Sequence, residues 1–227
     1  MSKAALKHLH QVDKTLSKLI RQVGPCDLRA KHELTPFEYL LRAIAYQQLT
    51  GKAAATIFGR VQALYVKAPT KPGAKLRFPK PREILDTPEA TLRGAGLSFA
   101  KIRAAKSLAQ FAVEGKLPSA KQILKMGDNE IIESLTQIRG IGPWTVQMML
   151  MFKLGRLDVM PNTDYGVRKG FSLLYKQKDL PAPKALLEYA ERWKPYRSVG
   201  AWYMWRAIEV HAPKPKTKTK PKTKTNR

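Results

Sequence analysis

Apolar residues recur along most of this chain at intervals of three and four, which is the spacing of one face of an α-helix. No stretch shows the convincing alternation of apolar and polar residues that a half-buried strand requires. The pattern therefore predicts an all-α protein. Helices are expected over residues 6–23, from 35 to a break near 51, and over 52–65, 81–86, 88–93, 98–114, 121–125, 128–138, 144–152, 165–175, 184–193 and 199–210.

Residue types at the expected helix starts support this division. Thr35, followed by Pro36 and by Glu38 three residues later, has the pattern of a capping box with proline in the first turn. Asp128 is expected to be the N-cap of the helix over 128–138. These signals indicate where individual helices begin, independently of how the helices pack.

Two segments differ from this pattern. Residues 67–82 are rich in proline and lysine, and we expect an exposed loop there. Residues 211–227 form a basic tail that we expect to be disordered, because the run "PKPKTKTKPKTKTNR" has no apolar residue to bury. The folded domain is therefore expected to span residues 1–210.

Charge points to the kind of partner. The chain has 42 Lys and Arg against 17 Asp and Glu, a net charge of +25, and only seven of these positive residues lie in the last seventeen positions. The excess thus belongs mainly to the folded part. A surplus of this size favours a polyanionic partner, and nucleic acid over an anionic membrane, although a merely soluble basic protein is the alternative.

Other residue types exclude several classes of site. A single cysteine, Cys26, allows neither an internal disulfide nor a four-thiolate iron–sulfur cluster. The four histidines are scattered without partners at zinc spacing, so no transition-metal site is expected. No apolar run is long enough for a membrane span, and there is no signal-peptide core. We expect an intracellular monomer, in the cytoplasm and nucleoid or in a eukaryotic nucleus.

The stretch "QIRGIGPW", residues 137–144, predicts a tight turn between two helices. Gly140 and Gly142 allow positive φ angles, Ile141 can fill the gap between the helices, and Pro143 suits a first helical turn. The exposed N–H groups at such a helix start can bind a phosphate without a charged side chain. A plain packed helical hairpin is the alternative reading of the same residues.

An aspartate, Asp164, follows the predicted turn at a distance that suggests a functional site. It follows Trp144 by twenty residues, after Pro161 and an Asn-Thr pair, directly before a helical pattern. Together with residues 42–57 and 192–207, this combination resembles the helix-hairpin-helix DNA glycosylases, in particular the alkylbase branch of the DNA-3-methyladenine glycosylase II type. The resemblance implies a two-lobed helical fold with a DNA cleft between lobes of residues 52–143 and of 1–51 plus 144–210. The extra N-terminal mixed domain of the bacterial archetype is not expected.

The resemblance also implies the site. Asp164 is expected to stabilise an oxocarbenium-like sugar during hydrolysis of an N-glycosidic bond, and it can cap the following helix as well. Trp144, Trp205 and Tyr165 are expected to line the pocket for a flipped base, with Trp205 beside Asp164. Trp193 and Trp202 are expected in the core. Indole faces favour cationic alkylated purines such as 3-methyladenine and 7-methylguanine.

The remaining expectations concern mechanism and the DNA contacts. Tryptophan at position 144 replaces the lysine of bifunctional relatives, which implies a monofunctional glycosylase; a glycosylase/lyase and a non-catalytic DNA-binding hairpin are the alternatives. The partner is expected to be double-stranded DNA with alkylated bases, and no membrane. No cofactor is expected beyond a Na⁺ or K⁺ ion held by the carbonyls of Gln137, Ile138 and Ile141. Gln48 and Leu49 are expected to wedge into the duplex, and the expected backbone contacts are Gly140, Gly142, Thr145, Lys52, Arg168 and Lys169, with Arg103 and Lys106 as further candidates.

Overall fold

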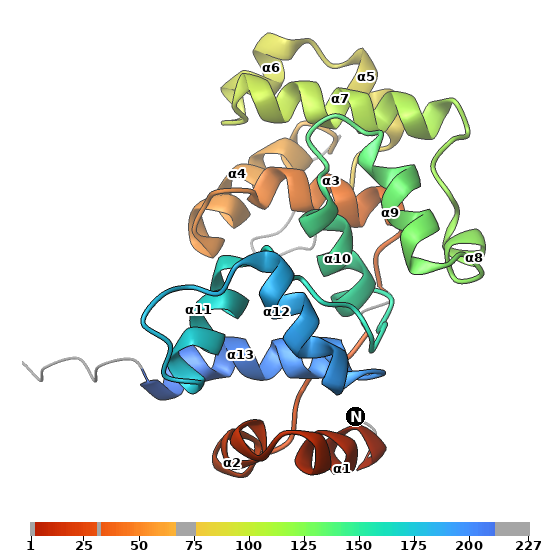
Figure 1. The fold of residues 1–227 in the computed structure, drawn as a ribbon. Coiled ribbons are helices and arrows are strands. Elements are labelled where there is room, and N and C mark those ends of the chain that lie inside the picture. Colours follow the sequence, from red (N-terminus) through yellow and green to blue (C-terminus); the bar gives the residue numbers. More distant parts are fainter. Residues whose placement is uncertain (1–2, 31–32, 67–75, 212–227) are drawn as a thin grey trace, which may run out of the picture.

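The computed structural model describes residues 3–30, 33–66 and 76–211, and within these ranges every regular element is a helix (Figure 1). No helix in this part of the chain is long and apolar enough to cross a membrane. Of the loop expected over residues 67–82, residues 67–75 lie outside the described residues, residues 76–80 have no regular structure, and residues 81 and 82 begin a helix. The basic tail expected over 211–227 lies outside the described residues from 212 onward, and His211 ends a helix. The helices are α1 Lys3–Val12, α2 Lys14–Val23, α3 Pro36–Tyr46, α4 Gly51–Ala63, α5 Pro81–Asp86, α6 Glu89–Gly94, α7 Phe99–Val113, α8 Ala120–Ile123, α9 Asp128–Thr136, α10 Pro143–Phe152, α11 Tyr165–Leu174, α12 Pro183–Ala190, the 3₁₀ turn η1 Glu191–Trp193 and α13 Arg197–His211.

The single helix expected over 6–23 is wrong, because the chain breaks at Asp13 into α1 and α2. Asp13 has an extended backbone, with φ −146° and ψ 98°, and its Oδ1 accepts the Leu16 N–H at 2.9 Å. An aspartate can bond to a nearby backbone N–H as an N-cap, and here that interaction interrupts the apolar helical pattern. The periodicity is right on both sides of the break.

The other helix starts follow local capping rules. The predicted capping box is confirmed: Thr35 Oγ1 accepts the Glu38 N–H at 3.2 Å, and Glu38 Oε2 accepts the Thr35 N–H at 2.7 Å. The prediction for Asp128 is wrong by one residue, since Gly127 is the N-cap of α9. Asp128 instead lies in the first turn, where a negative charge is favourable to the helix dipole.

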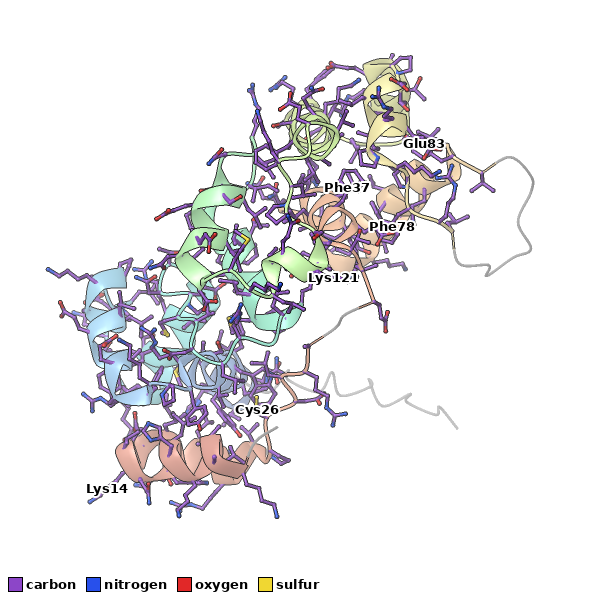
Figure 2. All side chains as sticks on the ribbon, turned by 90° about the vertical axis from the view of Figure 1, so that its right-hand side faces the viewer. Lys14, Cys26, Phe37, Phe78, Glu83 and Lys121 are labelled. Carbon is purple, nitrogen blue, oxygen red and sulfur yellow. The ribbon has the colours of Figure 1, made fainter. Side chains whose placement is uncertain are left out.

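The helices pack in two groups (Figure 1). The first group contains α3, α4, α7 and α5, and the second contains α11, α13, α2 and α1. Helix α10 packs against α9 and carries the chain from the first group toward the second. Figure 2, turned by 90°, shows the same arrangement, with Glu83 at one end of the molecule and Lys14 at the other.

The position of α3 differs from the expected division into lobes. The predicted lobes grouped residues 36–46 with the N- and C-terminal helices, but α3 packs against α4 and α7. Leu41 and Ile44 of α3 share a small buried hollow with Phe58 of α4 and Ala105 of α7. The apolar face of α3 is thus buried in the first group, and the segment between α2 and α3 connects the two groups.

The second group is held together around one buried carboxylate. Asp13 Oδ2 accepts hydrogen bonds from the Tyr175 hydroxyl at 2.6 Å, the Trp193 Nε1 at 3.0 Å and the Tyr189 hydroxyl at 3.2 Å. Burial and the neighbouring carboxylate raise the pKa of Tyr175, so its hydroxyl keeps the proton that it donates. Trp193 is fully buried as predicted, whereas Trp202 is only half-buried, with the Arg206 guanidinium 5.2 Å from its ring centre.

Candidate active site

Asp164 lies at the start of α11 and caps it. Its Oδ1 accepts the Val167 N–H at 2.7 Å, and its own N–H bonds to the Pro161 carbonyl at 3.0 Å. The predicted capping role is therefore confirmed. The same residue remains partly exposed, so its carboxylate is both fixed and accessible.

Two tryptophans from separate helices converge on this carboxylate. Trp144 Nε1, in the first turn of α10, donates to Asp164 Oδ2 at 2.7 Å. Trp205 Nε1, from the middle of α13, donates to Asp164 Oδ1 at 2.9 Å. Both donors are neutral, so they orient the carboxylate without cancelling its charge. The structure thus joins three of the predicted site residues in one hydrogen-bonded unit.

Two glycines in α11 make this convergence possible. A Cβ at Gly166 would lie 2.8 Å from Trp205 Cδ1, closer than a Cβ approaches another atom, and 3.1 Å from Asp164 Oδ1. A Cβ at Gly170 would lie 1.8 Å from the Met204 carbonyl oxygen. The helices α11 and α13 therefore cross with almost no space between their backbones. Neither glycine was predicted as part of the site, although two glycines four positions apart on one helix face indicate close packing.

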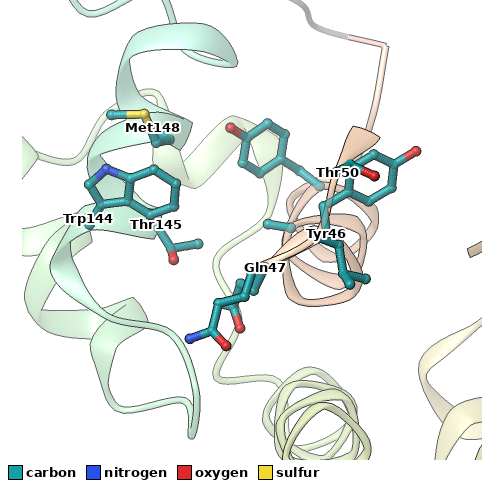
Figure 3. A pocket seen from close by; sticks show the side chains of 10 residues that line it. Tyr46, Gln47, Thr50, Trp144, Thr145 and Met148 are labelled. Carbon is teal, nitrogen blue, oxygen red and sulfur yellow. The ribbon is translucent and has the colours of Figure 1, made fainter. Parts of the chain in front are cut away.

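A cavity of about 970 Å³ opens beside Trp144. In Figure 3, Trp144, Thr145 and Met148 of α10 lie on one side of it, and Tyr46, Gln47 and Thr50 lie on the other. The lining residues are Tyr39, Ala43, Tyr46, Gln47, Gln48, Leu49, Thr50, Trp144, Thr145 and Met148.

The aromatic lining differs from the predicted one. Tyr39 and Tyr46 face the cavity together with Trp144, and sequence analysis gave neither tyrosine a role. Burial raises the pKa of Tyr39 to about 12, so its ring stays a neutral phenol. Trp205 and Tyr165 are not among the lining residues. Trp205 turns its N–H to the carboxylate and packs its ring near Phe152, and Tyr165 is 66% exposed outside the cavity.

The hairpin between α9 and α10 needs a glycine at one position only. Gly140 has φ +80°, and a Cβ there would lie 2.7 Å from the Cβ of Ala104 on α7. Gly142 has φ −99°, so the expected positive φ is wrong at this position. Gly142 is the N-cap of α10, and a Cβ there would meet nothing within 4 Å. Ile141 is buried between the helices, as predicted.

The turn between α3 and α4 borders the same cavity. Gln48 has φ +56°, a conformation that non-glycine residues rarely adopt and that costs about 1–3 kcal/mol. Leu49 is 39% exposed. The two residues predicted as the wedge thus lie at an exposed tip beside the pocket, on a strained backbone of the kind that occurs at functional sites.

The predicted backbone contacts fall into two kinds. Lys52, in the first turn of α4, is exposed, and so is Arg103. Lys106 is not free to bind phosphate, because its amine donates to the carbonyls of Leu85 and Thr87 at 2.8 and 3.0 Å.

Three other predicted contacts are at least partly buried within the protein. Arg168 is half-buried and donates through Nε to the Pro181 carbonyl at 2.9 Å. Lys169 is half-buried as well, and Thr145 is buried, with its N–H bonded to the Gly142 carbonyl at 3.0 Å. Sequence analysis missed Arg139, an exposed cation at the hairpin itself.

The hairpin carbonyls suit the predicted monovalent ion chemically. Alkali ions prefer hard oxygen ligands, and the carbonyls of Gln137, Ile138 and Ile141 belong to this turn. The Ile138 carbonyl also accepts the Ile141 N–H at 3.0 Å, which leaves one of its two lone pairs. Within the described ranges, no group of three or more His, Cys, Asp or Glu side chains could hold another metal.

Comparison with known proteins connects this geometry to a family. Residues 41–195 match the family described as HhH-GPD superfamily base excision DNA repair protein. The DNA-3-methyladenine glycosylase 1 of Schizosaccharomyces pombe is 36% identical over 204 residues, which are 89% of this chain and 86% of that protein.

Solved structures show the same similarity in three dimensions. The 3-methyladenine DNA glycosylase of S. pombe in complex with abasic DNA matches with a TM-score of 0.78 at 35% identity, over 92% of this chain and 98% of that one. A DNA-3-methyladenine glycosidase from Bacillus halodurans matches with a TM-score of 0.76 at 33% identity, over 91% and 89% of the two chains. The likeness therefore includes both groups of helices.

Proposed function

The chain belongs to the HhH-GPD superfamily of base excision DNA repair proteins, and we propose that it is a monofunctional DNA glycosylase acting on alkylated purines in duplex DNA. It hydrolyses the N-glycosidic bond of bases such as 3-methyladenine and 7-methylguanine, and it leaves an abasic site in an intact strand. The carboxylate of Asp164, held by two indole N–H groups beside an aromatic cavity, carries this proposal.

The carboxylate supplies negative charge where positive charge develops. Breaking an N-glycosidic bond creates an oxocarbenium-like sugar, which a nearby carboxylate stabilises. Oδ1 of Asp164 already accepts two hydrogen bonds, and Oδ2 accepts one from Trp144. Since each carboxylate oxygen has two lone pairs, Oδ2 keeps one for the sugar or for the attacking water.

The cavity supports the substrate class. A glycosylase must extrude the target nucleotide and receive its base in a pocket. Tyr39, Tyr46 and Trp144 offer neutral π-systems there, and such faces attract a purine that alkylation has made cationic. A neutral, undamaged base gains less from this attraction and is harder to unpair.

The absence of an amine in α10 supports the monofunctional reaction. A lyase attacks the sugar with an amine, but residues 143–152 contain no lysine, and position 144 is occupied by a tryptophan bonded to Asp164. The amine of Lys153, at the far end of α10, donates to the Leu34 carbonyl. Water is therefore the nucleophile.

DNA binding rests on backbone groups and exposed cations. The N-terminus of α10, open at Gly142, presents N–H groups to a phosphate, and a Na⁺ or K⁺ ion on the hairpin carbonyls would add to this contact. Lys52 and Arg139 extend the basic surface. The net charge of +25 adds sequence-independent affinity for DNA, and the protein works inside the cell where genomic DNA lies.

Base release from methylated genomic DNA tests the proposal, with strand breaks counted before and after alkali. The wild-type protein should produce alkali-sensitive sites without direct breaks, and Asp164→Asn should release bases on the order of 100-fold more slowly. Asparagine can still cap α11, so the variant should fold. Release of no base by the wild type would indicate a non-catalytic DNA-binding protein. Covalent trapping on borohydride reduction would indicate a lyase.

A further inference from the structure

Gln47 connects two parts of the candidate DNA-binding surface that are far apart in sequence. It follows the last residue of α3, and its side-chain Nε2 donates to the Gly140 carbonyl of the hairpin at 3.0 Å, across 93 positions. Figure 3 shows the Gln47 side chain between the end of α3 and the start of α10. Among the described residues, Gln47 is the only one in the turn between α3 and α4 whose side chain forms a hydrogen bond with the hairpin.

The turn that contains Gln47, from Tyr46 to Leu49, is strained at its third residue, Gln48. Gln47 has φ −53° and ψ 133°, Gln48 has φ +56°, and the Leu49 N–H returns to the Tyr46 carbonyl at 3.4 Å. These values describe a type II turn, whose third residue is usually glycine. A glutamine with a positive φ, such as Gln48, persists only when the surrounding structure stabilises the turn.

The hairpin at the other end of this bond is firmly held. Gly140 packs against Ala104 of α7 so closely that no Cβ fits between them, and the Arg139 N–H donates to Ser107 Oγ at 3.1 Å. Lys101, also on α7, donates its amine to the Ala45 carbonyl at 2.9 Å, at the end of α3. Helix α7 thus supports the turn and the hairpin from one side, and Gln47 joins them directly.

We propose that Gln47 is a positioning residue that fixes the Gln48–Leu49 tip relative to the hairpin. This inference rests on the proposed glycosylase function, in which the tip enters the gap left by the flipped nucleotide while the hairpin binds the backbone. With the Gln47 bond formed, the distance between wedge and phosphate contact is set before DNA arrives. Without it, the tip must be ordered during base flipping, which slows the reaction on paired DNA.

Gln47→Met and Gln47→Glu test this role, because methionine lacks the donor and glutamate offers only acceptors to the Gly140 carbonyl. The probe is 7-methylguanine in a paired duplex and in the same strand alone, with base release measured under single-turnover conditions. The duplex requires a wedge, whereas the single strand does not. We expect the ratio of duplex to single-strand rates to fall about 3- to 10-fold in both variants, as loss of one hydrogen bond allows.

Gln62→Met is the matched control, since Gln62 Nε2 donates to the Leu76 carbonyl at 3.0 Å in the same manner but away from the cavity. Its rate ratio should equal that of the wild type. A purely structural role of Gln47 would lower both rates together and leave the ratio unchanged, which would overturn the proposal. In a second measurement, Leu49→Ala should make the Gln47→Met effect on the ratio disappear, and fully additive effects would also overturn it. Lack of base release by the wild type would instead contradict the proposed function.

Discussion

Asp164 shows how one side chain can cap a helix and still present a partly exposed carboxylate to a candidate active site. Its Oδ1 bonds to the Val167 N–H as an N-cap and to Trp205, and its Oδ2 bonds to Trp144. The cap fixes the position of the carboxylate, and the indoles fix its rotation about χ2. Because none of the three donors is charged, the carboxylate keeps its full negative charge, as the proposed stabilisation of an oxocarbenium-like sugar requires.

Removal of single indole donors tests this arrangement at the residue scale. Trp205→Phe should keep the ring packing near Phe152 but lose the N–H to Oδ1, and Trp144→Phe should lose the N–H to Oδ2. Hydrogen bonds to charged groups contribute about 1.5–3 kcal/mol. We therefore expect base release to slow about 10-fold or more in each variant, measured under single-turnover conditions.

Trp202→Phe is the control for these variants, since Trp202 lies on α13 with its ring beside Tyr203 and Arg206 rather than at Asp164. Its rate of base release should match that of the wild type. Unchanged rates in both active-site variants would mean that the indole donors do not orient the carboxylate for catalysis.

At the scale of elements, the hairpin shows that two glycines in one turn can have different roles. Gly140 is required by its backbone conformation and by its contact with α7. Gly142 has an ordinary φ and open space around it. The first glycine is therefore needed by the fold, and the second leaves the start of α10 uncovered, as the proposed phosphate contact requires.

Alanine substitutions should separate these roles. Gly140→Ala forces a left-handed alanine against Ala104 and should lower the free energy of unfolding by about 2–4 kcal/mol. Gly142→Ala should cost less than about 1 kcal/mol but weaken binding to abasic DNA, because its methyl group occupies the space for the phosphate. Urea denaturation and fluorescence anisotropy measure the two effects. Equal loss of stability in both variants would refute the distinction.

The break between α1 and α2 shows how one residue can end a helix and also connect it to other elements. Asp13 ends one helix, caps the next and binds three side chains of the C-terminal helices. The residue that interrupts the helical pattern thus also helps to attach the N-terminal helices to the C-terminal ones.

Asp13→Ala should lower the free energy of unfolding by about 3–5 kcal/mol, since it leaves buried donors without an acceptor. Asp27→Ala is the control, because its carboxylate is 77% exposed and its ion pair with Arg29 is worth at most about 1 kcal/mol. Urea denaturation of both variants gives the comparison. A loss at Asp13 no larger than that at Asp27 would show that the carboxylate does not hold the N-terminal helices.

At the scale of the whole molecule, the two groups of helices bring the site together from distant segments. Helix α10 supplies Trp144 and one wall of the cavity, α3 and the following turn supply the opposite wall, and α13 supplies Trp205. The chain as a whole carries a net charge of +25. Most of the positive charge lies on the folded part, and the rest lies in the tail after residue 211.

Deletion of residues 213–227 removes seven cations and should make DNA binding less dependent on salt. The slope of log K against log salt concentration reflects the number of neutralised phosphates, at about 0.9 per contact. We expect a shallower slope and weaker nonspecific binding, measured by anisotropy at several salt concentrations. An unchanged slope would show that the tail does not contact DNA, and base release by the truncated chain at low salt serves as the control for folding.

The amino-acid sequence by itself determined the all-α class, most helix bounds to within a few residues, the capping box at Thr35, the buried Ile141 and the cap at Asp164. Each depends on residues within about four positions of one another, where periodicity and capping act directly. The resemblance at the hairpin and Asp164 also identified the family correctly.

Only the tertiary structure decided what lies across from each of these elements. The resemblance placed Trp205 beside Asp164, but their hydrogen bond over 41 positions forms because Gly166 and Gly170 let α13 approach α11. Tyr39 and Tyr46 became walls of the cavity because α3 packs with α7 and not with the C-terminal helices. Such contacts depend on how helix faces fit together, and the periodicity of a single helix contains no information about its neighbour.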